Sequence, residues 1–559
     1  MFTLKKNNQI SAINNIFMNS VVKCFFVKCF FVLLSVMLLY VVVATRLNAA
    51  QQNENVRQMN ELFSGDGVLL SLKLEIPESS ANSLRRDPRK YAPCTVIEGD
   101  RVYSNVAVHL KGSAGSFRGF DDKPGFTINF SHFQPKQRFH GVRKIHLNNS
   151  VQDPTFLSEY ICGYLFRAAG VPATRVAHAY VQVNNKKPEL YVLKESFEKE
   201  FFRQYFIEDN GNAYGESGGA DVDTQMHKME GDGVKDWSDL KQLAAAAREN
   251  NPTNCYEKLR EILEIDRFIS FMALEVMLCH WDGYTFARHN YRLYHDPGTG
   301  KFTFIPHDLD QMMQDPNVPI VPGVNGMVAQ AIFRIPELKK RYTERFEEIY
   351  VDYFRPDDLT NRINTIVSKL KPKIAEFDKN FAQEFENRSQ NLKDRIVNRA
   401  NSIRRQLATI NPEPPQIRET LLKAENWRNA VEDSTSAAFE IQKKENGGNV
   451  LYIKAKNKTT ASWRCMANVP PGNYIFEIKA KCANLAVNEE VKDAGAVIRS
   501  SGLNAKPSNP LKGVSDWQRL ESKFEVFTKT NIEFVCEMRA ISGEVWFDLD
   551  TLKVIRVNN

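Results

Sequence analysis

The stretch that decides the fold is Cys279–Gln311, which reads CHWDGYTFARHNYRLYHDPGTGKFTFIPHDLDQ. It follows a predicted helix over Ile265–Leu278, in which apolar residues recur at helical spacing. Two short strands, Tyr291–Tyr294 and Lys301–Ile305, are predicted to pair through the turn-rich segment Asp296–Gly300. Such a hairpin brings the loop before its first strand and the loop after its second strand to the same end.

Three oxygen-bearing side chains, Asp282, Asn290 and Asp308, are expected to converge at that end of the hairpin. Phosphoryl transfer needs one carboxylate near the attacking hydroxyl. It also needs an amide and a second carboxylate to hold the metal ion that bridges the phosphates. Protein kinases present these groups in the same chain order. The alternative interpretation is structural, because Asp and Asn are common turn formers and Pro306-His307-Asp308 can simply end a strand.

Further motifs accompany these residues. In the central stretch they are His280-Trp281-Asp282, Asn290-Tyr291, Asp296-Pro297 and Pro306-His307-Asp308-Leu309-Asp310. Upstream they are Lys111-Gly112-Ser113, Lys123-Pro124-Gly125-Phe126, Lys144-Ile145-His146-Leu147-Asn148, Asp153-Pro154, Gly170-Val171-Pro172-Ala173 and Tyr191-Val192-Leu193-Lys194-Glu195. In this order they resemble the spore coat protein H (CotH) kinase family over Leu69–Tyr350. Two positions depart from its pattern: His307 stands where Trp is usual, and Thr127 where a second basic residue is frequent.

The resemblance implies an α+β, atypical protein-kinase-like fold with two lobes. It also implies an ATP-dependent kinase that phosphorylates Ser or Thr of a protein acceptor. Asp282 would be the catalytic residue that orients or deprotonates the acceptor hydroxyl. Asn290 and Asp308 would hold Mg²⁺ or Mn²⁺, with Asp310 behind them or as a second metal ligand.

The nucleotide is expected to meet the strands upstream of this stretch. The alternating strand Val102–Leu110 runs into a Gly/Ser loop that contains Lys111 and Ser113. Such a loop suits a phosphate, because Gly lets backbone N–H groups approach and Ser hydroxyls donate. A plain hairpin turn is the alternative interpretation of this motif alone.

A kinase-like site also requires a Lys for the phosphates, held by a carboxylate on a nearby helix. Glu159, in the predicted helix Thr155–Ala169, is the candidate carboxylate. The resemblance favours Lys123 as the phosphate ligand and places Lys144 second, although the residues themselves do not decide between them. The alternative is that both lysines are exposed and that Glu159 favours the helix N-terminus.

Glu195 is a further candidate for cofactor binding. It ends the motif Tyr191–Glu195, which lies where a kinase-like architecture has the hinge that meets adenine. Hinge contacts are made by the backbone, so residue types neither support nor exclude this role.

The N-terminal residues 1–50 have the pattern of a targeting segment. An apolar run, Cys29–Ala44, follows Lys23 and Lys28 and precedes the small-residue exit Asn48-Ala49-Ala50. The run is short for a spanning helix and suits a signal peptide cleaved near Ala50. An uncleaved membrane anchor is the runner-up, and only then does the protein meet a membrane. Both predict an exported chain, whether secreted, periplasmic or at the cell surface.

Charge argues against a nucleic-acid partner. The 559 residues carry a formal net charge of +7, and residues 1–50 supply five of these charges, so the remainder carries only +2. A surface that tracks phosphates needs a clustered basic face.

The chain is long enough for two or three domains. The predicted division is a flexible lead-in over 51–67, a CotH-like kinase domain over 68–410, a Pro-rich linker over 411–417 and a β-sandwich over 418–559. Within the kinase domain the N-lobe is expected at about 68–195 and the C-lobe at about 196–410.

The last segment changes to short alternating strands separated by turn signals, which predicts an all-β jelly-roll sandwich. Trp517-Gln518-Arg519-Leu520 and Val545–Asp550 resemble carbohydrate-binding modules of the galactose-binding type, which implies a glycan partner. Exposed Trp463 or Trp517 would stack on a sugar ring, and Trp546 is expected in the core. A single disulfide among the cysteines of this segment is also possible.

Two alternative functions follow from the same residues. One is a non-catalytic cell-surface or envelope binding protein that keeps a kinase-like fold, which the sandwich and His307 favour. The other is a kinase whose acceptor is a glycan presented by the sandwich.

Overall fold

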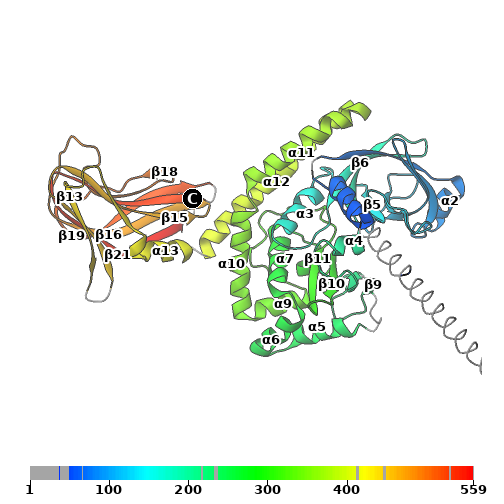
Figure 1. Ribbon diagram of the computed structural model, residues 1–559, viewed down its shortest axis with the longest axis horizontal. Coiled ribbons are helices and arrows are strands. Elements are labelled where there is room, and N and C mark those ends of the chain that lie inside the picture. Colours follow the sequence, from blue (N-terminus) through cyan, green and yellow to red (C-terminus); the bar gives the residue numbers. More distant parts are fainter. Residues whose placement is uncertain are drawn as a thin grey trace, which may run out of the picture.

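The computed structural model describes Met37 and residues 50–65, 67–215, 218–231, 237–410, 415–444, 448–527 and 530–557. A β-barrel, a helical body and a C-terminal sandwich follow one another (Figure 1), which confirms the α+β class with a following all-β domain. The predicted signal peptide or anchor lies outside the described residues except for Met37 and Ala50. Within the described ranges, no helix is both long enough and apolar enough to cross a membrane.

The N-terminal domain is a closed barrel of seven strands in the order β1-β2-β3-β4-β5-β7-β6. They are β1 (Leu69–Glu75), β2 (Ala92–Glu98), β3 (Arg101–Lys111), β4 (Gly125–Asn129), β5 (Lys144–Asn148), β6 (Val176–Val183) and β7 (Glu189–Glu195). Neighbours run antiparallel except β1 and β6, which are parallel. Two helices accompany the barrel, α2 (Glu78–Arg86) and α3 (Ser158–Ala168).

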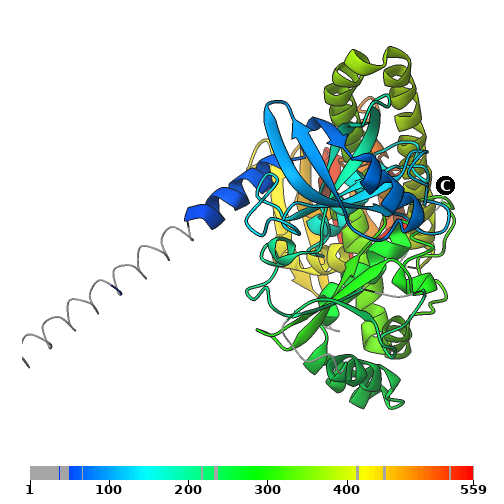
Figure 2. The same ribbon diagram turned by 90° about the vertical axis from the view of Figure 1, so that its right-hand side faces the viewer.

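The expected flexible lead-in over 51–67 is instead helical in its first part. Residues 50–62 are helical and lie beside the barrel (Figure 2). Met59, Leu62 and Phe63 are buried in the barrel core, and Asn60 Oδ1 accepts a hydrogen bond of 2.8 Å from Arg175 Nη1. The apolar side chains recur at i, i+3 and i+4, which is helical spacing within an otherwise polar segment.

The helical body surrounds a small sheet of order β11-β10-β8-β9. Its strands are β8 (Asn212–Gly215), β9 (His227–Glu230), β10 (Tyr291–Asp296) and β11 (Lys301–Pro306). Its helices are α4 (Lys199–Phe202), α5 (Ser238–Arg248), α6 (Pro252–Ile262), α7 (Ile265–Met277), α8 (Tyr284–Ala287), α9 (Met327–Arg334), α10 (Pro336–Asp352), α11 (Pro356–Phe377) and α12 (Lys379–Ile410). Helix α7 is buried along almost its whole length and forms the centre of the body.

Arg399 of helix α12 is fully buried and lies at the C-terminal end of α7. Its Nε and Nη2 donate to the carbonyl oxygens of Met277 and Val276 at 3.0 and 2.9 Å. Its Nη1 donates to the carbonyl oxygens of Pro316 and Val318 at 2.8 and 2.7 Å. A cation at a helix C-terminus is favourable, so Arg399 fixes the point from which the chain leaves α7.

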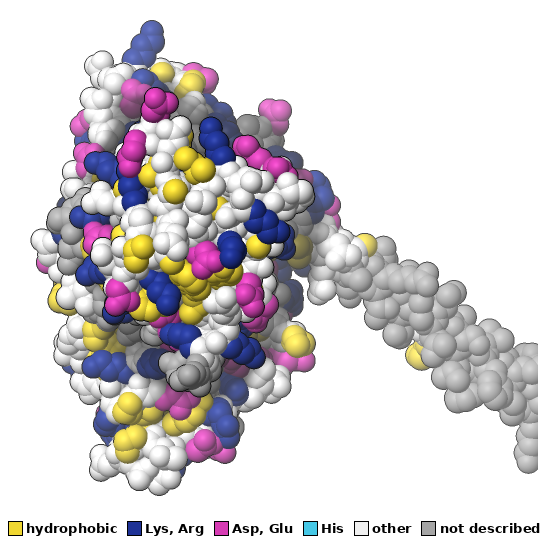
Figure 3. Space-filling view, turned by 90° about the vertical axis from the view of Figure 1, so that its left-hand side faces the viewer, with side chains coloured by type: hydrophobic (Ala, Val, Ile, Leu, Met, Phe, Trp, Pro, Cys, Tyr) yellow, Lys and Arg dark blue, Asp and Glu magenta, His cyan; other side chains and the backbone are white. Residues whose placement is uncertain are grey.

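The C-terminal sandwich packs a four-stranded sheet, β12-β15-β20-β17, on a six-stranded one, β13-β14-β21-β16-β19-β18. Its strands are β12 (Arg428–Val431), β13 (Ala437–Lys443), β14 (Asn449–Ala455), β15 (Thr459–Val469), β16 (Gly472–Ala486), β17 (Gly495–Ser500), β18 (Leu503–Lys506), β19 (Gly513–Val526), β20 (Thr530–Ala540) and β21 (Ser542–Val557). On the face of the molecule that carries the sandwich, side chains of both charges are interspersed with hydrophobic ones (Figure 3).

The junction with the sandwich differs from the predicted linker. Residues 415–417 begin helix α13 (Pro415–Leu422), whereas 411–414 lie outside the described residues. Ile417 and Leu421 of α13 are buried in the sandwich core. Arg556 of β21, itself buried, forms an ion pair of 2.9 Å with Glu347 of α10, so the last strand of the sandwich is tied to the helical body.

Two predictions for tryptophans of the sandwich are wrong. Trp463 is buried against Phe439, with ring centroids 5.5 Å apart, and its Nε1–H donates to the carbonyl of Tyr452. Trp546 is partly exposed, because its neighbours Val545 and Phe547 occupy the core side of β21.

The possible disulfide is likewise absent from the described part of the chain. All seven cysteines there are free and buried: Cys94, Cys162, Cys255, Cys279, Cys465, Cys482 and Cys536.

Candidate functional site

The hairpin brings its two flanking loops together as expected. Tyr291 of β10 pairs with Pro306 of β11, and the His307 N–H donates to the Asn290 carbonyl at 2.8 Å. The side-chain amide of Asn290 donates to Asp282 Oδ2 at 3.0 Å. Asn290 and Asp308 both adopt left-handed backbone conformations, with φ of 50° and 52°. Asn and Asp adopt this conformation more readily than most residues other than glycine, and here it turns the chain at both ends of the hairpin.

A buried carboxylate shapes the loop that carries Asp282. Glu275, near the end of α7, accepts hydrogen bonds from the N–H groups of Tyr284 and Thr285 at 2.9 and 2.8 Å. Gly283 fits only because it lacks a side chain, since a Cβ there would lie 2.4 Å from Glu275 Oε1. The turn after Asp282 is therefore held by α7, whose end is held in turn by Arg399.

A cavity of about 200 Å³ lies between the barrel and this hairpin. Six predicted site residues line it: Lys111, Ser113, Glu159, Asn290, Asp308 and Asp310. Gly112 bends the loop into position at φ 112°, and a Cβ there would meet the Phe117 backbone at 2.9 Å. The Gly/Ser loop and the carboxylates thus line the same cavity, which suits a phosphate bound through a cation.

A chain of polar contacts, partly buried at Lys111 and Asn148, links the barrel side of the cavity to α3. Lys111 Nζ donates to Asn148 Oδ1, and the Asn148 amide donates to Glu159 Oε1 at 2.9 Å. Glu159 Oε2 lies 2.6 Å from Lys194 Nζ, and both of these side chains are buried. This chain fixes one cation, Lys111, on the cavity wall and places a second, Lys194, behind it.

Carboxylates crowd the opposite wall. Burial, with the charges of Asp308, Glu159 and Asp153, raises the pKa of Asp310 to about 8. Burial also raises the pKa of Asp282, and the charge of Asp308 adds to this shift. Asp282 and Asp308 therefore lie on the same side of the molecule, close enough for their charges to interact. Acids held this close are stabilised by a bound cation.

The donor set fits a hard divalent cation. Asp308 and Asp310 supply carboxylate oxygens, and Asn290 supplies an amide oxygen, which are the ligand types that Mg²⁺ prefers. In the ranges that the structure describes, no group of three or more His, Cys, Asp or Glu side chains is placed to hold a metal ion alone. Nucleotide phosphates and water would complete the coordination, as is usual for Mg²⁺.

Three predicted nucleotide ligands lie elsewhere. Lys123 is paired with Glu189 at 3.5 Å and lies over the rings of Phe156 and Tyr191. It precedes β4 and does not line the cavity. The prediction that Lys123 pairs with Glu159 is therefore wrong.

Lys144 and Glu195 also have other partners. Lys144 forms an ion pair with Glu198, because it begins β5, about 13 Å of strand away from Asn148 on the cavity wall. Glu195 is paired with Arg175 at 2.8 Å. It alternates with Lys194 along β7, so its side chain points to the opposite face.

Lys194 is the functional candidate that sequence reasoning missed as a site residue. The pairing of β5 with β7 places it opposite His146, on the same face as Val192 of the cavity wall. Its position in the Tyr191–Glu195 motif was visible in the sequence. Lys194 and Glu195 are adjacent and point to opposite faces of β7, and only the strand register shows that Lys194 is the one that faces α3.

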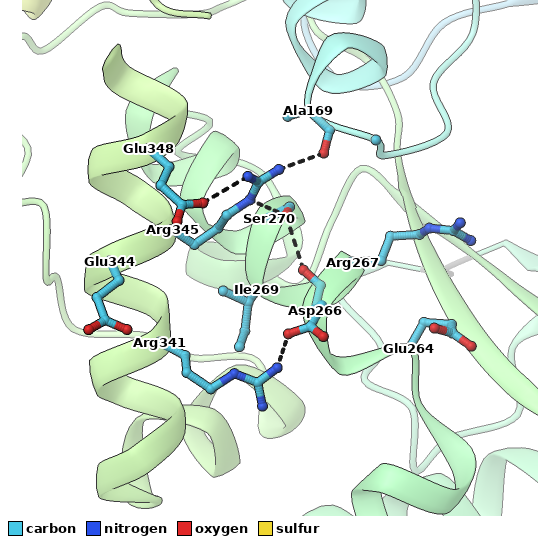
Figure 4. Close-up of a pocket in the computed structure, with 11 residues that line it drawn as sticks. Ala169, Glu264, Asp266, Arg267, Ile269, Ser270, Arg341, Glu344, Arg345 and Glu348 are labelled. Carbon is cyan, nitrogen blue, oxygen red and sulfur yellow. Dashed lines mark hydrogen bonds and ion pairs between the residues drawn. The ribbon is translucent and has the colours of Figure 1, made fainter. Parts of the chain in front are cut away.

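A larger hollow of about 560 Å³ lies between α7 and α10, away from these residues (Figure 4). Arg341 of α10 is paired with Asp266 of α7 across it, whereas Arg345 is paired with Glu348 of its own helix. Arg345 also donates to Ser270 Oγ and to the Ala169 carbonyl. Its arginines thus already have partners, and the hollow contains none of the predicted catalytic groups.

A barrel lobe with a buried Lys–Glu pair, facing Asp, Asn and Asp on a helical lobe, is the arrangement of a protein-kinase-like site. The chain matches the family model described as CotH kinase protein over residues 108–431, and it belongs to that family.

Two curated relatives are similar over much of the chain. The inner spore coat protein H of Bacillus subtilis (strain 168) is 23% identical over 337 residues, which cover 54% of this chain and 90% of that protein. The invasin CotH2 of Rhizopus delemar is 23% identical over 290 residues, which cover 44% of this chain and 48% of that protein. The chain therefore spans about half the length of the fungal relative.

Solved structures are similar to each part separately. The Helicobacter pylori proinflammatory kinase CtkA shares 11% identity at a TM-score of 0.19, covering 52% of this chain and 96% of its own. TmCBM61, solved with β-1,4-galactotriose, shares 11% identity at a TM-score of 0.19, covering 26% of this chain and 95% of its own. Both TM-scores are low, so function is inferred from the family and the site.

Proposed function

We propose that this chain is an exported, metal-dependent kinase that transfers the γ-phosphate of ATP to Ser or Thr of a protein. The observation that supports this best is the convergence of Asp282, Asn290 and Asp308 at one end of the β10–β11 hairpin. Asn290 and Asp308 line a cavity whose other wall carries Lys111, and Asp282 is hydrogen-bonded to Asn290 beside it.

Each residue has a role in this proposal. Asp282 orients the acceptor hydroxyl and takes its proton. Asn290, Asp308 and Asp310 would hold a Mg²⁺ or Mn²⁺ ion, which when bound neutralises charge on the phosphates. Lys111 binds phosphate oxygens from the barrel side. The Lys194–Glu159 ion pair holds α3 against β7.

The test compares the wild type with Asp308→Ala, using labelled ATP, a divalent metal and a generic protein acceptor. The variant loses a metal ligand, so transfer is expected only from the wild type. Equal transfer from both proteins would refute the metal role of Asp308.

A non-catalytic binding protein is the alternative, and nucleotide binding separates the two. A ligand at 100 times its Kd adds about 2.7 kcal/mol to the free energy of unfolding. The kinase proposal therefore expects a clear rise in melting temperature with Mg-ATP. A melting temperature that does not move would favour the binding protein.

We also propose that the sandwich binds a glycan through an aromatic row, defined as Tyr452, Trp546 and Trp517. The strand register places Tyr452 opposite Trp546, and Trp546 opposite Lys481, across the six-stranded sheet. The Lys481 ammonium lies 5.0 and 5.1 Å from the ring centroids of Trp546 and Trp517. All three rings are partly exposed, and flat aromatic faces with adjacent polar groups suit sugar rings.

A glycan array probed with the full chain tests this second proposal. Trp546→Ala and Trp517→Ala are expected to lose binding, because each removes a stacking face. Met466→Ala is the matched control, since Met466 is exposed on β15 of the other sheet. Equal binding by all four proteins would exclude the aromatic row.

Export is tested by N-terminal sequencing of the mature protein. Cleavage near Ala50 is expected for a signal peptide, and an intact N-terminus in a membrane fraction would favour the anchor.

A further inference from the structure

A lysine ammonium lies inside the aromatic row of the sandwich. Four adjacent strands, β14, β21, β16 and β19, carry in turn Tyr452, Trp546, Lys481 and Trp517. Lys481 is opposite Trp546 in the strand register, and its Nζ lies 5.0 and 5.1 Å from the ring centroids of Trp546 and Trp517. Because neighbouring strands are about 4.8 Å apart, the row extends over about 14 Å, and the ammonium lies within it rather than at an end.

An irregularity in the strand pairing directs Trp517 toward this lysine. The register of β16 and β19 shifts between Ala480 and Cys482, where Lys481 faces two residues of β19, Asp516 and Trp517. Such a bulge redirects the side chains that it carries. Lys481 is thus held between two indole rings, which attract its charge. The ammonium is therefore in position before any ligand arrives, which favours a specific contact.

The carboxylates beside Trp546 are paired with other lysines. Glu544 and Asp548 lie two residues before and two residues after Trp546, on the same face of β21. Glu544 is paired with Lys454, and Asp548 with Lys444, each at 2.8 Å. Among the residues that the structure describes, no carboxylate pairs with the ammonium in the row. Its N–H groups are therefore available to an acceptor on a ligand.

We propose that the aromatic row binds an anionic glycan and that Lys481 is the specificity-determining residue, which binds a carboxylate or sulfate of the sugar. The inference rests on the proposed glycan-binding role of this row. The indole rings stack on the sugars to either side, so the anionic group belongs to a sugar within the chain rather than at its end. A charge-assisted hydrogen bond is stronger than a neutral one, so the row selects acidic glycans over neutral ones.

The test probes a glycan array with the full chain. Each carboxylated or sulfated oligosaccharide on the array is accompanied by its methyl-esterified or unsulfated counterpart. The wild type is expected to bind an anionic glycan at least about tenfold more tightly than its neutral counterpart, and this preference should weaken as salt rises. The class of anionic glycan that binds identifies the group as a carboxylate or a sulfate.

Lys481→Met keeps the aliphatic stem between the indoles and removes the charge. It is expected to lose the preference for anionic glycans while binding their neutral counterparts as the wild type does. Lys481→Arg restores a cation that can stack on an indole, and it should restore the preference. Lys523→Met is the matched control, because Lys523 lies on β19, six residues from Trp517, and its side chain is 70% exposed.

Unfolding curves check that each variant is folded. A wild type that binds neutral oligosaccharides as tightly as their anionic counterparts would overturn the role of Lys481 alone. A preference that persists in Lys481→Met, or that Lys523→Met loses equally, would do the same. No binding of the wild type to any glycan would overturn the proposed glycan-binding role itself, and the anion contact with it.

Discussion

Lys194 Nζ lies 2.6 Å from Glu159 Oε2, and the two side chains are only 3% and 4% exposed. The pair joins β7 of the barrel to α3 beside the candidate nucleotide cavity. Because Glu159 also accepts a hydrogen bond from Asn148, its carboxylate has partners on two strands.

Lys194→Met leaves the Glu159 carboxylate buried without its cation. Removing one partner of a buried ion pair costs about 3–5 kcal/mol, so the free energy of unfolding is expected to fall by that amount. Urea unfolding followed by circular dichroism measures it. Phosphotransfer is expected to fall as well, because α3 then loses its tie to β7.

Lys187→Met is the matched control for that variant. Lys187 pairs with Asp378 at 2.7 Å, but its side chain is 69% exposed. An exposed pair contributes about 0–1 kcal/mol. Equal losses in the two variants would contradict the structural importance of the Lys194–Glu159 pair.

Asp282→Asn separates proton transfer from nucleotide binding. The amide cannot take the acceptor proton, so phosphotransfer is expected to fall by about 10²–10⁴. Asp282 does not line the cavity, and its amide oxygen can still accept from Asn290. Mg-ATP should therefore raise the melting temperature of the variant as much as that of the wild type. A lost Mg-ATP shift would instead assign Asp282 to nucleotide binding.

Asp310 makes stability depend on pH when no cation is present. Its pKa is about 8 in the folded protein and about 3.9 in an unfolded chain. Between these values the folded state keeps a proton that the unfolded state releases, so the free energy of unfolding falls as pH rises from about 4 to about 8. Unfolding at pH 5 and pH 8 in a chelator should show a larger loss for the wild type than for Asp310→Asn.

The same carboxyl predicts proton release when metal binds. A cation favours the ionised form, so Mg-ATP binding at pH 7 should release up to about one proton per chain. Calorimetry in two buffers of different ionisation enthalpy measures this number. Asp310→Asn should release fewer protons, and an unchanged number would remove Asp310 from the metal site.

Arg399→Met tests the anchor of the loop that carries Asp282. It removes donors from buried carbonyls of Val276 and Met277, so the free energy of unfolding is expected to fall by about 2–5 kcal/mol. Arg405→Met, on the exposed side of the same helix, should stay within about 0.5 kcal/mol of the wild type. Denaturant titrations of the two variants compare them directly, and a small loss for Arg399→Met would argue against the anchor.

The hairpin and its flanking loops could be predicted because the pattern is local. Turn residues fix the register of β10 and β11, and the register alone brings Asn290 and Asp308 to one end. The lysines could not be assigned in this way. Lys194 faces Glu159 because β5 and β7 pair across a long separation in sequence, and no local pattern reports that pairing.

The tryptophans show a different kind of error. Trp546 follows Val545 and precedes Phe547, so strict alternation places it on the outer face, and a period-two assignment would have found it. The burial of Trp463 depends on how the two sheets stack, which the alternation along β15 does not reveal. The spacing of Met59, Leu62 and Phe63 indicates a helix over residues 50–62. The polar composition of the segment instead favoured a flexible lead-in.

The buried thiols can report the unfolding of each core separately. Cys94 lies in the barrel core, Cys162 in the helical body and Cys536 in the sandwich core. A thiol reagent can reach each of them only after the surrounding core has opened. The order in which the three are alkylated during slow denaturation therefore gives the order in which the cores unfold, with no engineered label.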